Sequence, residues 1–316
     1  MKAFYMAAFG GPEVMKYGEL PDPTPGSGQV LVEVKATSLN PLDWKLRAGA
    51  FRMVQGSRLP KVLGSDVAGV VKALGPGVTG FKPGDAVYGT CRIFIGKPGA
   101  QAQLVTAEAS QLRHKPEWLT FEQAAALPVA ALTALAGLRP CGNLAGKNVL
   151  VNGATGGVGH FALQVAKARG ARVTAVCSGR NAELARSLGA DEVIDYAGED
   201  FTQAGKRYDV IFDAHGQLGL NKVAPVLAPQ GFYANPLPGP RLMLQSLWGR
   251  LTRGQQAVPT NLRNLPEDYA ELEDLLRNKG VKPVIEQVFP LERAAEGFAV
   301  AEGGKARGKV VLQVAG

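Results

Sequence analysis

The stretch Val149-Leu150-Val151-Asn152-Gly153-Ala154-Thr155-Gly156-Gly157-Val158-Gly159 joins an apolar segment to a segment with helical spacing. Residues 147–152 are mostly apolar, which predicts a buried strand. From 157 to 169 the apolar side chains recur on one helix face, which predicts a helix. Residues 171–176 predict a second strand. A strand, a glycine-rich turn, a helix and another strand within about 30 residues predict a βαβ unit.

The same turn has the spacing of a dinucleotide-binding fingerprint. In the G-x-G-x-x-G pattern the three positions are Ala154, Gly156 and Gly159, so alanine replaces the first glycine. Gly156 lets the backbone approach a pyrophosphate, and Gly159 lets the helix pack closely on the strand. The helix N-terminus then offers N–H groups and a partial positive charge to the phosphates. The turn therefore predicts a bound dinucleotide.

The end of the second strand favours NADP(H) over NAD(H). A site for NAD(H) usually has Asp or Glu about 20 residues beyond the glycines, where the carboxylate bonds the ribose 2′-hydroxyl. This chain has Ser178-Gly179-Arg180 there and no acid. A hydroxyl and a guanidinium suit a 2′-phosphate, because Arg offers paired donors to phosphate oxygens. The alternative is that Arg180 only faces solvent at the start of the next helix.

Outside the βαβ unit, the pattern differs between the two ends of the chain. Residues 29–37 alternate apolar and polar side chains, residues 62–74 are rich in valine, and a Gly/Pro turn follows at 80–85. Short strands with such turns predict a compact β-rich domain. Beyond about residue 120, strands and helices alternate, which predicts a doubly wound parallel sheet. The predicted fold class is therefore α/β with two domains.

The composition excludes several kinds of protein. The 316 residues include 40 Gly but only 3 Cys and 3 His, with 46% hydrophobic and 20% charged residues, as in ordinary globular proteins. The spacings of Cys and His fit neither a zinc motif nor a disulfide scaffold, so we predict no metal site. No apolar stretch is long enough for a transmembrane helix, and no secretory h-region is present at the start. We expect a cytoplasmic, reduced protein.

Further motifs lie on both sides of the fingerprint, at 38–45, 63–71, 81–85, 124–134, 188–196 and 306–312. In order and spacing they resemble zinc-free members of the medium-chain dehydrogenase/reductase superfamily, in the branch of quinone oxidoreductases and enone reductases. The resemblance implies a GroES-like catalytic domain at 1–122 and 303–316. It also implies a Rossmann domain at 123–302, NADPH bound in the cleft between the domains, and a homodimer.

Carried over by position, the resemblance also implies which residues contact the cofactor. The expected contacts are Gly156, Gly157 and Val158 at the pyrophosphate, Ser178, Arg180 and Tyr196 around the adenosine 2′-phosphate, Thr133 and Asn40 near the nicotinamide, and Arg307 and Lys309 elsewhere on NADP(H).

The zinc-dependent relatives carry ligands at positions that this chain fills otherwise. The resemblance places a Cys ligand near Leu39 or Asn40, a Gly-His-Glu triplet at Gly64-Ser65-Asp66, and a four-Cys lobe at 90–110, where only Cys91 is present. Without zinc ligands there is no strong Lewis acid to polarise an alcohol. We therefore expect hydride transfer from NADPH to a quinone or an α,β-unsaturated carbonyl, whose product anion a hydrogen bond can stabilise.

The segment 40–45 holds the candidate catalytic residues Asn40, Asp43 and Lys45. Asn40 could orient a carbonyl or the nicotinamide ribose. Lys45 could stabilise an oxyanion or relay a proton if its pKa is lowered, and Asp43 could pair with Lys45 and hold it charged. The alternative is that Asp43 and Lys45 form only a structural pair in a turn.

Two features leave alternatives open. His215 follows a predicted strand where the cofactor passes, and we favour a space-filling role over a bond to the cofactor. Residues 240–253 mix Leu, Met and Trp with three Arg. We favour a lid or a subunit contact there, but the pattern also suits an anionic membrane surface. A non-catalytic or membrane-peripheral adaptor that keeps the NADP-binding fold is therefore the alternative function.

The net charge of +8 does not indicate a nucleic-acid partner. The basic residues are spread along the chain, and no nucleic-acid motif accompanies them. We therefore expect a small-molecule substrate and no nucleic acid.

Overall fold

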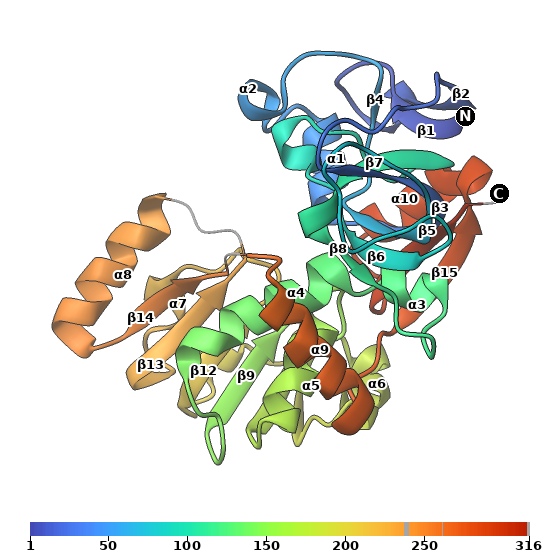
Figure 1. Ribbon diagram of the computed structural model, residues 1–316. Coiled ribbons are helices and arrows are strands. Elements are labelled where there is room, and N and C mark those ends of the chain that lie inside the picture. Colours follow the sequence, from blue (N-terminus) through green and yellow to red (C-terminus); the bar gives the residue numbers. More distant parts are fainter. Residues whose placement is uncertain (237–239, 261, 315–316) are drawn as a thin grey trace. The chain divides into compact units, whose positions relative to one another are not determined.

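The chain divides into two compact units, and the fingerprint turn lies in the second (Figure 1). The computed structural model describes residues 1–236, 240–260 and 262–314. The first unit comprises Met1–Val129, Asn264–Pro266 and Ile285–Gly316, and the second comprises Ala130–Arg263 and Glu267–Val284.

Parallel strands form the sheet of the second unit. They are β9 (Asn148–Asn152), β10 (Arg172–Cys177), β11 (Glu192–Asp195), β12 (Tyr208–Asp213), β13 (Leu227–Asn235) and β14 (Gln256–Pro259). Their order is β11-β10-β9-β12-β13-β14. The chain moves outward from β9 to β11 and then continues from β12 on the other side of β9. This reversal confirms the predicted doubly wound sheet, in which ligands bind beyond the carboxyl ends of the strands beside the reversal.

Helices alternate with these strands, as the sequence predicts. They are α4 (Pro128–Leu138), α5 (Gly159–Ala168), α6 (Ala182–Ser187), α7 (Leu220–Val223), α8 (Pro240–Arg253) and α9 (Pro266–Asn278), with 3₁₀ turns η4 (Arg139–Cys141), η5 (Gly179–Asn181) and η6 (Phe201–Gln203). Helix α5 packs against β9, β10 and β12. A Cβ on Gly159 would lie 2.0 Å from the carbonyl oxygen of Gly153, so only glycine allows the helix to start this close to the turn.

The first unit is rich in β-structure, which confirms the predicted β-rich domain. Its helices are α1 (Pro41–Arg47), α2 (Arg52–Gln55), α3 (Phe121–Ala125) and α10 (Ala294–Glu302), with 3₁₀ turns η1 (Pro12–Val14), η2 (Ile93–Ile95), η3 (Ala109–Gln111) and η7 (Leu291–Arg293). Its strands are β1 (Lys2–Met6), β2 (Met15–Glu19), β3 (Gln29–Ser38), β4 (Lys61–Val62), β5 (Asp66–Leu74), β6 (Ala86–Thr90), β7 (Leu104–Glu108), β8 (Leu112–His114), β15 (Ile285–Pro290) and β16 (Lys309–Gln313). They pair as β2-β1-β4 and as β15-β16-β3-β5-β6-β8, with β7 on β3.

The unit boundaries differ from the predicted ones at both junctions. Residues 285–302 lie in the first unit, whereas the sequence analysis placed them with the Rossmann domain, and residues 123–129 also lie in the first unit. The reason is packing: β15 pairs in parallel with β16, and Phe298 of α10 lies in the core of the first unit with its ring 5.7 Å from that of Phe4. Local sequence patterns do not report such long-range contacts.

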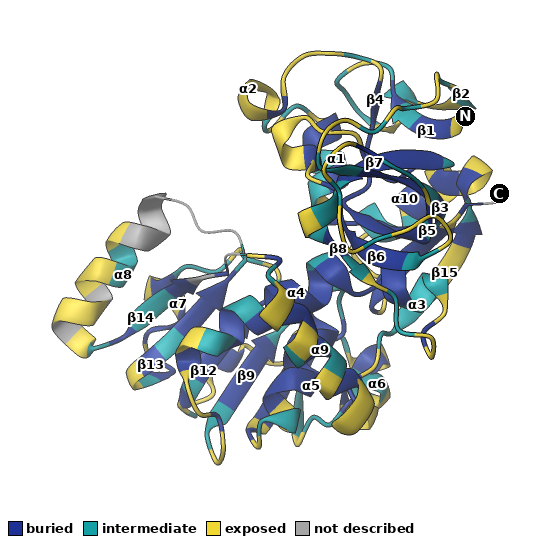
Figure 2. Ribbon diagram, in the orientation of Figure 1, coloured by how far each residue is buried: buried dark blue, intermediate teal, exposed yellow. Residues whose placement is uncertain are grey.

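Each unit has a hydrophobic core of its own. The core of the second unit includes Leu150 of β9, Val176 of β10 and Ile211 of β12. Figure 2 shows these strands as largely buried, whereas much of α8 is exposed. Within the described part of the chain, no helix combines the length and the apolar character needed to cross a membrane.

Candidate functional site

The glycine-rich turn of the second unit presents backbone N–H groups at the start of α5. Within the described residues, the N–H groups of Gly157 and Val158 donate no hydrogen bond. A Cβ on Gly156 would meet only the Gly153 carbonyl oxygen, at 3.4 Å, so a ligand can approach the backbone there. The three residues predicted to hold the pyrophosphate therefore form a surface with the partial positive charge of a helix N-terminus.

Polar side chains at the ends of neighbouring strands support this turn. Asn152 Nδ2 at the end of β9 donates to Asp213 Oδ1 at the end of β12, at 2.8 Å. Asp213 Oδ2 accepts from the Tyr233 hydroxyl at 2.8 Å. Burial, together with the charge of Asp213, raises the pKa of Tyr233, so that its hydroxyl stays a donor. Asn181 Nδ2, beyond β10, donates to Thr155 Oγ1 at 3.2 Å. The sequence analysis missed these residues, although polar residues that end apolar strands are a usable signal.

The residues predicted to surround the 2′-phosphate lie together at one end of the sheet. Ser178 and Arg180 follow β10, and Tyr196 follows β11. The two strands pair in parallel with Cys177 opposite Asp195, and the Tyr196 N–H donates to the Cys177 carbonyl at 3.3 Å. This register brings the ends of β10 and β11 side by side.

The structure also brings an acid to this place. A Cβ on Gly179 would lie 2.5 Å from Asp195 Oδ2, so the Asp195 carboxylate lies directly beside the turn that carries Arg180. The sequence analysis looked for an acid only at the end of β10. Strand pairing supplies one from β11 instead, because Asp195 lies opposite Cys177 at the end of β10.

His215 lies at the end of β12, beside the fingerprint turn. Its side chain is exposed, and a Cβ on Gly153 would lie 2.7 Å from the imidazole ring. The ring therefore lies against the fingerprint turn, because β12 ends next to β9. Both the space-filling role and a bond to the cofactor stay predictions for this ring.

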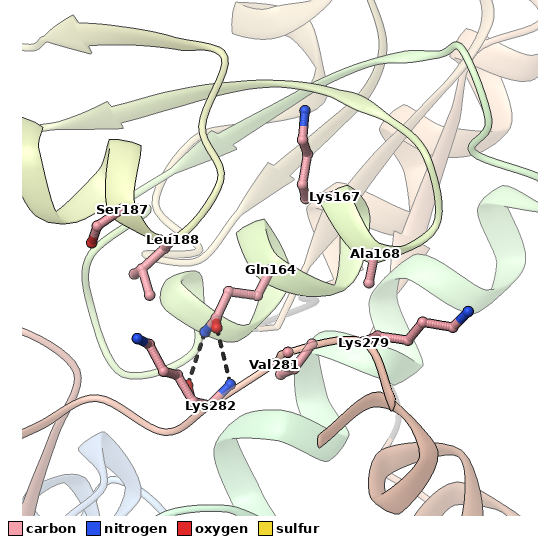
Figure 3. A pocket seen from close by; sticks show the side chains of 9 residues that line it. Gln164, Lys167, Ala168, Ser187, Leu188, Lys279, Val281 and Lys282 are labelled. Atoms are coloured by element: carbon pink, nitrogen blue, oxygen red, sulfur yellow. Dashed lines mark hydrogen bonds between the residues drawn. The ribbon is translucent and has the colours of Figure 1, made fainter. Parts of the chain in front are cut away.

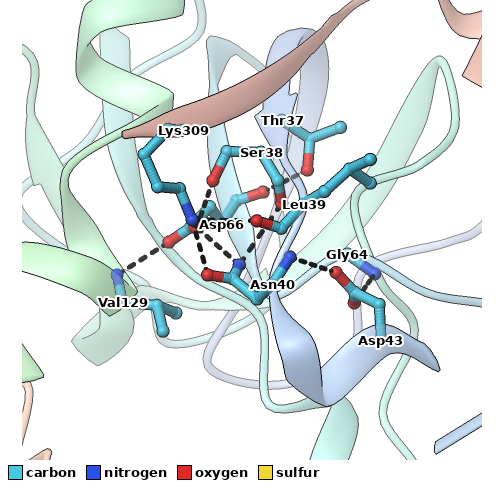
Figure 4. A network of polar contacts seen from close by, with 9 residues as sticks. All are labelled: Thr37, Ser38, Leu39, Asn40, Asp43, Gly64, Asp66, Val129 and Lys309. Atoms are coloured by element: carbon cyan, nitrogen blue, oxygen red, sulfur yellow. Dashed lines mark hydrogen bonds and ion pairs between the residues drawn. The ribbon is translucent and has the colours of Figure 1, made fainter. Parts of the chain in front are cut away.

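The first unit contains a buried polar network where β3 ends and where α1, β5 and β16 begin (Figure 4). Lys309 Nζ donates to Asn40 Oδ1 at 2.6 Å and lies 3.6 Å from Asp66 Oδ2. Asn40 Nδ2 donates to Asp66 Oδ2 at 2.8 Å, and Ser38 Oγ donates to the same oxygen at 2.5 Å. Lys309 is only 3% exposed and Asp66 is fully buried. Asn40 therefore links a buried cation to a buried carboxylate.

Asp43 lies next to this network and is held by backbone groups. Its Oδ2 accepts from the Asn40 N–H at 2.8 Å and its Oδ1 accepts from the Gly64 N–H at 3.1 Å. Complete burial raises the pKa of Asp43 to about 7, against the opposing effect of the two N–H donors. Burial also lowers the pKa of Lys309, whereas Asp66 opposes that change. The network thus holds a carboxyl group that changes charge near neutral pH.

The structure does not pair Lys45 with Asp43. Among the described residues, the hydrogen bonds to Asp43 come from backbone N–H groups. Residues two apart on a helix point in different directions, so the side chains of positions 43 and 45 of α1 do not face each other. The hypothesis of a structural Asp43–Lys45 pair is therefore wrong, and Lys45 is a half-buried residue of its own.

The remaining predicted cofactor contacts lie in different surroundings. Thr133 is buried in α4 of the second unit. Arg307 is exposed just before β16, and its Nε donates to Glu286 Oε2 at 3.1 Å. Lys309 follows two residues later but belongs to the buried network.

No cluster of three or more His, Cys, Asp or Glu able to hold a metal ion occurs in the described ranges. Asp66 and Ser65 stand where the zinc-dependent pattern has Glu and His, and Asp66 bonds Ser38, Asn40 and the Val129 N–H. Cys91 is buried, which raises its pKa to about 12.

Comparisons with known proteins agree with this architecture. Residues 26–117 match the family described as alcohol dehydrogenase GroES-like domain, and residues 188–312 match the family described as zinc-binding dehydrogenase. The chain is 37% identical over 315 residues to the chloroplastic quinone-oxidoreductase QR1 of Triphysaria versicolor, which covers 96% of this chain and 95% of the relative.

Two further similarities point the same way. The chain is 37% identical over 322 residues to the chloroplastic NADPH-dependent alkenal/one oxidoreductase of Arabidopsis thaliana, over 99% of this chain and 79% of the relative. The solved structure of the quinone oxidoreductase from Coxiella burnetii matches with a TM-score of 0.92 at 33% identity, over 100% of this chain and 99% of that chain.

We expect the Asp43 carboxyl to lose its proton near pH 7. Its pKa in the folded protein lies above the ordinary value of 3.8. Between about pH 4 and pH 7 the folded protein therefore binds this proton more tightly than the unfolded chain, and the contribution of Asp43 to the free energy of unfolding falls as the pH rises. Infrared difference spectra across this range should show loss of a buried carboxyl band in the wild type and not in Asp43→Asn. A carboxylate already ionised at the acidic end would contradict the assignment.

Proposed function

Because the chain belongs to the medium-chain dehydrogenase/reductase superfamily, we propose that it reduces quinones or α,β-unsaturated carbonyl compounds with NADPH and without zinc. The chain is an oxidoreductase of this superfamily. The observation that carries the proposal is the fingerprint turn beside the strand reversal, where the Gly157 and Val158 N–H groups donate no hydrogen bond within the described ranges. The names of the similar proteins, a quinone oxidoreductase and an alkenal/one oxidoreductase, support the two acceptor classes.

NADPH, when bound, supplies a hydride, and the acceptor also needs one proton. The chain's own residues would bind the pyrophosphate through Gly157 and Val158, and the 2′-phosphate through Ser178 and Arg180. Hydride addition leaves negative charge on the acceptor oxygen, which a positioned donor or cation stabilises. Protein groups can perform each of these steps without a bound metal ion.

From the buried network we infer different roles for the three catalytic candidates. Asn40 already donates to Asp66 and Ser38 and accepts from Lys309, and Asp43 accepts from two backbone N–H groups. We infer that both act as positioning residues that fix the start of α1. Lys45 is half-buried on the same helix, and we propose that its ammonium stabilises the developing oxyanion.

We expect NADPH oxidation with a quinone or an enone and not with a simple aldehyde, and no loss of rate after treatment with a chelator. Lys45→Met should lower kcat by about a hundredfold, the usual loss for one oxyanion donor. Lys82→Met, an exposed lysine of the same unit, is the matched control and should leave kcat unchanged. Lack of turnover with every quinone and enone would refute the function, whereas an unchanged Lys45→Met enzyme would remove only Lys45.

We expect the preference for NADPH over NADH to depend on two opposing charges. Arg180→Ala should raise the Kd for NADPH by about tenfold and leave that for NADH nearly unchanged, since a charged hydrogen bond contributes about 1.5–3 kcal/mol before screening by solvent. Asp195→Asn should shift the preference further toward NADPH, because it removes negative charge beside Gly179. Fluorescence titrations measure both, with the exposed Arg186→Ala as the control. Tighter binding of NADH by the wild type would contradict this view.

Helix α8 favours a second candidate function, attachment to an anionic membrane surface. Leu244, Leu247, Trp248 and Leu251 recur at helical spacing and are each 60% to 75% exposed. Arg250 and Arg253 are exposed on the same helix. An apolar face with flanking cations suits the interface of an anionic bilayer. A lid and a subunit contact stay predictions for the same helix.

Co-sedimentation with vesicles at physiological salt tests this attachment. Attachment through α8 predicts binding to vesicles that contain anionic lipid. It also predicts loss of most of that binding in Leu247→Glu, because a charge replaces apolar area on the face that would enter the membrane interface. The control is Val288→Glu, which changes an exposed apolar residue outside α8. Leu20→Glu would not serve, because Leu20 packs against a buried cluster of the first unit. Failure of the wild type to bind would end the membrane hypothesis.

A homodimer and a cytoplasmic location are further proposals. The three cysteines are free and buried, as suits a reducing compartment.

A further inference from the structure

We propose that His160 is a positioning residue that fixes the Gly156–Gly157 peptide and so directs the Gly157 N–H toward the pyrophosphate. This inference rests on the proposed function, because it assigns a role in the same cofactor site. His160 is the second residue of α5, and its side chain is buried and not exposed to solvent. It would therefore act through the backbone and not by contact with the cofactor.

The contacts of His160 join the fingerprint turn to a distant segment. Its side chain is completely buried. Nδ1 lies 2.9 Å from the Gly156 carbonyl oxygen, and the His160 backbone N–H donates to the same oxygen at 3.1 Å. Nε2 accepts from the Val284 N–H at 3.2 Å. The ring is therefore held from both sides.

These partners define the state of the imidazole. The Val284 N–H is a donor, so Nε2 must be the unprotonated nitrogen. In a neutral imidazole the proton then lies on Nδ1, which donates to the Gly156 carbonyl. Val284 thus selects the one tautomer that can bond the turn.

The geometry of the peptide bond transmits this contact to the cofactor side. The Gly156–Gly157 peptide is trans, since the only cis bond in the described chain is Leu59–Pro60. In a planar trans peptide the C=O and the following N–H point in opposite directions. With the Gly156 carbonyl turned toward His160, the Gly157 N–H points away from the helix. That N–H is one of the groups without a hydrogen bond among the described residues.

The hydrogen bond from the His160 ring to the Gly156 carbonyl matters because the Gly156–Gly157 peptide joins two glycines. Rotation of a peptide changes ψ of the residue before it and φ of the residue after it, and glycine permits values that other residues do not. A Gly–Gly peptide can therefore flip at little steric cost, and a flip would present a carbonyl oxygen to the phosphates. The ring bond to the Gly156 carbonyl opposes that flip.

Gln164 offers a matched control on the same helix (Figure 3). Its Nε2 donates to the Lys282 carbonyl and its Oε1 accepts from the Lys282 N–H, both at 3.0 Å. Like His160, it is buried and ties α5 to the segment before β15. Its Nε2 also donates to the His160 carbonyl at 2.9 Å, within α5. Unlike the His160 ring, it bonds no carbonyl or N–H group of residues 153–159 among the described residues. If His160 served only to pack that segment, the two residues would behave alike.

The test compares His160→Phe, His160→Asn and Gln164→Met in titrations with NADPH and with adenosine 2′-monophosphate, which has no pyrophosphate. His160→Phe should raise the Kd for NADPH by about three- to tenfold, the size of one hydrogen bond. The Kd for adenosine 2′-monophosphate should stay within about twofold in every variant. His160→Asn should bind NADPH like the wild type, because a short amide can reach the carbonyl four residues earlier in a helix. Gln164→Met should lower the melting temperature but not the affinity.

Three results would overturn the proposal: wild-type affinity in His160→Phe, an equal loss in Gln164→Met, or an equal loss for adenosine 2′-monophosphate. A wild type that binds no NADPH would instead refute the proposed function. The restraint that His160 places on the Gly156–Gly157 peptide can then still be tested on the protein without cofactor. The measurement is ¹⁵N relaxation dispersion, which detects microsecond to millisecond exchange. Exchange at Gly157 should appear in His160→Phe and be absent in the wild type and in His160→Asn. The same exchange at Gly157 in all three proteins would refute the proposed restraint of this peptide by His160.

Discussion

The second unit depends on one close approach, that of the start of α5 to the Gly153 carbonyl. A Cβ on Gly159 would lie 2.0 Å from that oxygen, so any other residue would push the helix away from β9. With the helix in place, its first N–H groups lie beside the point where the strand order reverses. The turn is then held in place by polar side chains near the ends of β9, β12 and β13 and by the ring of His160. A surface suited to phosphates follows from packing that only glycine allows.

The sequence predicted those parts of the structure that depend on local patterns. The βαβ unit, the alternation of strands and helices, and the β-rich first unit all follow from hydrophobic spacing and glycine-rich turns. The positions of β15 and α10 could not be predicted in this way, because Phe298 packs against Phe4 almost 300 residues away in the chain. Asp195 was missed for a related reason, since only the register of β11 against β10 brings it to Gly179. Lys309 and Asp66 likewise meet only in the fold.

In the first unit, a buried ion pair lies where the zinc-dependent pattern has metal ligands. Asp66 stands at a position where the zinc-dependent pattern has Glu, and Lys309 provides the opposing positive charge. Such a pair gains little stability by itself, but removal of either partner would leave an unpaired buried charge, at a cost of about 3–5 kcal/mol. Through Asn40 it fixes the start of α1, the helix that carries Asp43 and Lys45.

We propose that this chain passes a hydride from NADPH to an electron-poor acceptor. The most direct measurement uses NADPH that carries deuterium at both C4 positions, with an enone as the acceptor and mass spectrometry and NMR of the product. The account predicts one deuterium on the β-carbon and a solvent proton on the α-carbon. A saturated product without deuterium would contradict it, as would the failure of every enone and every quinone to be reduced while the cofactor is bound.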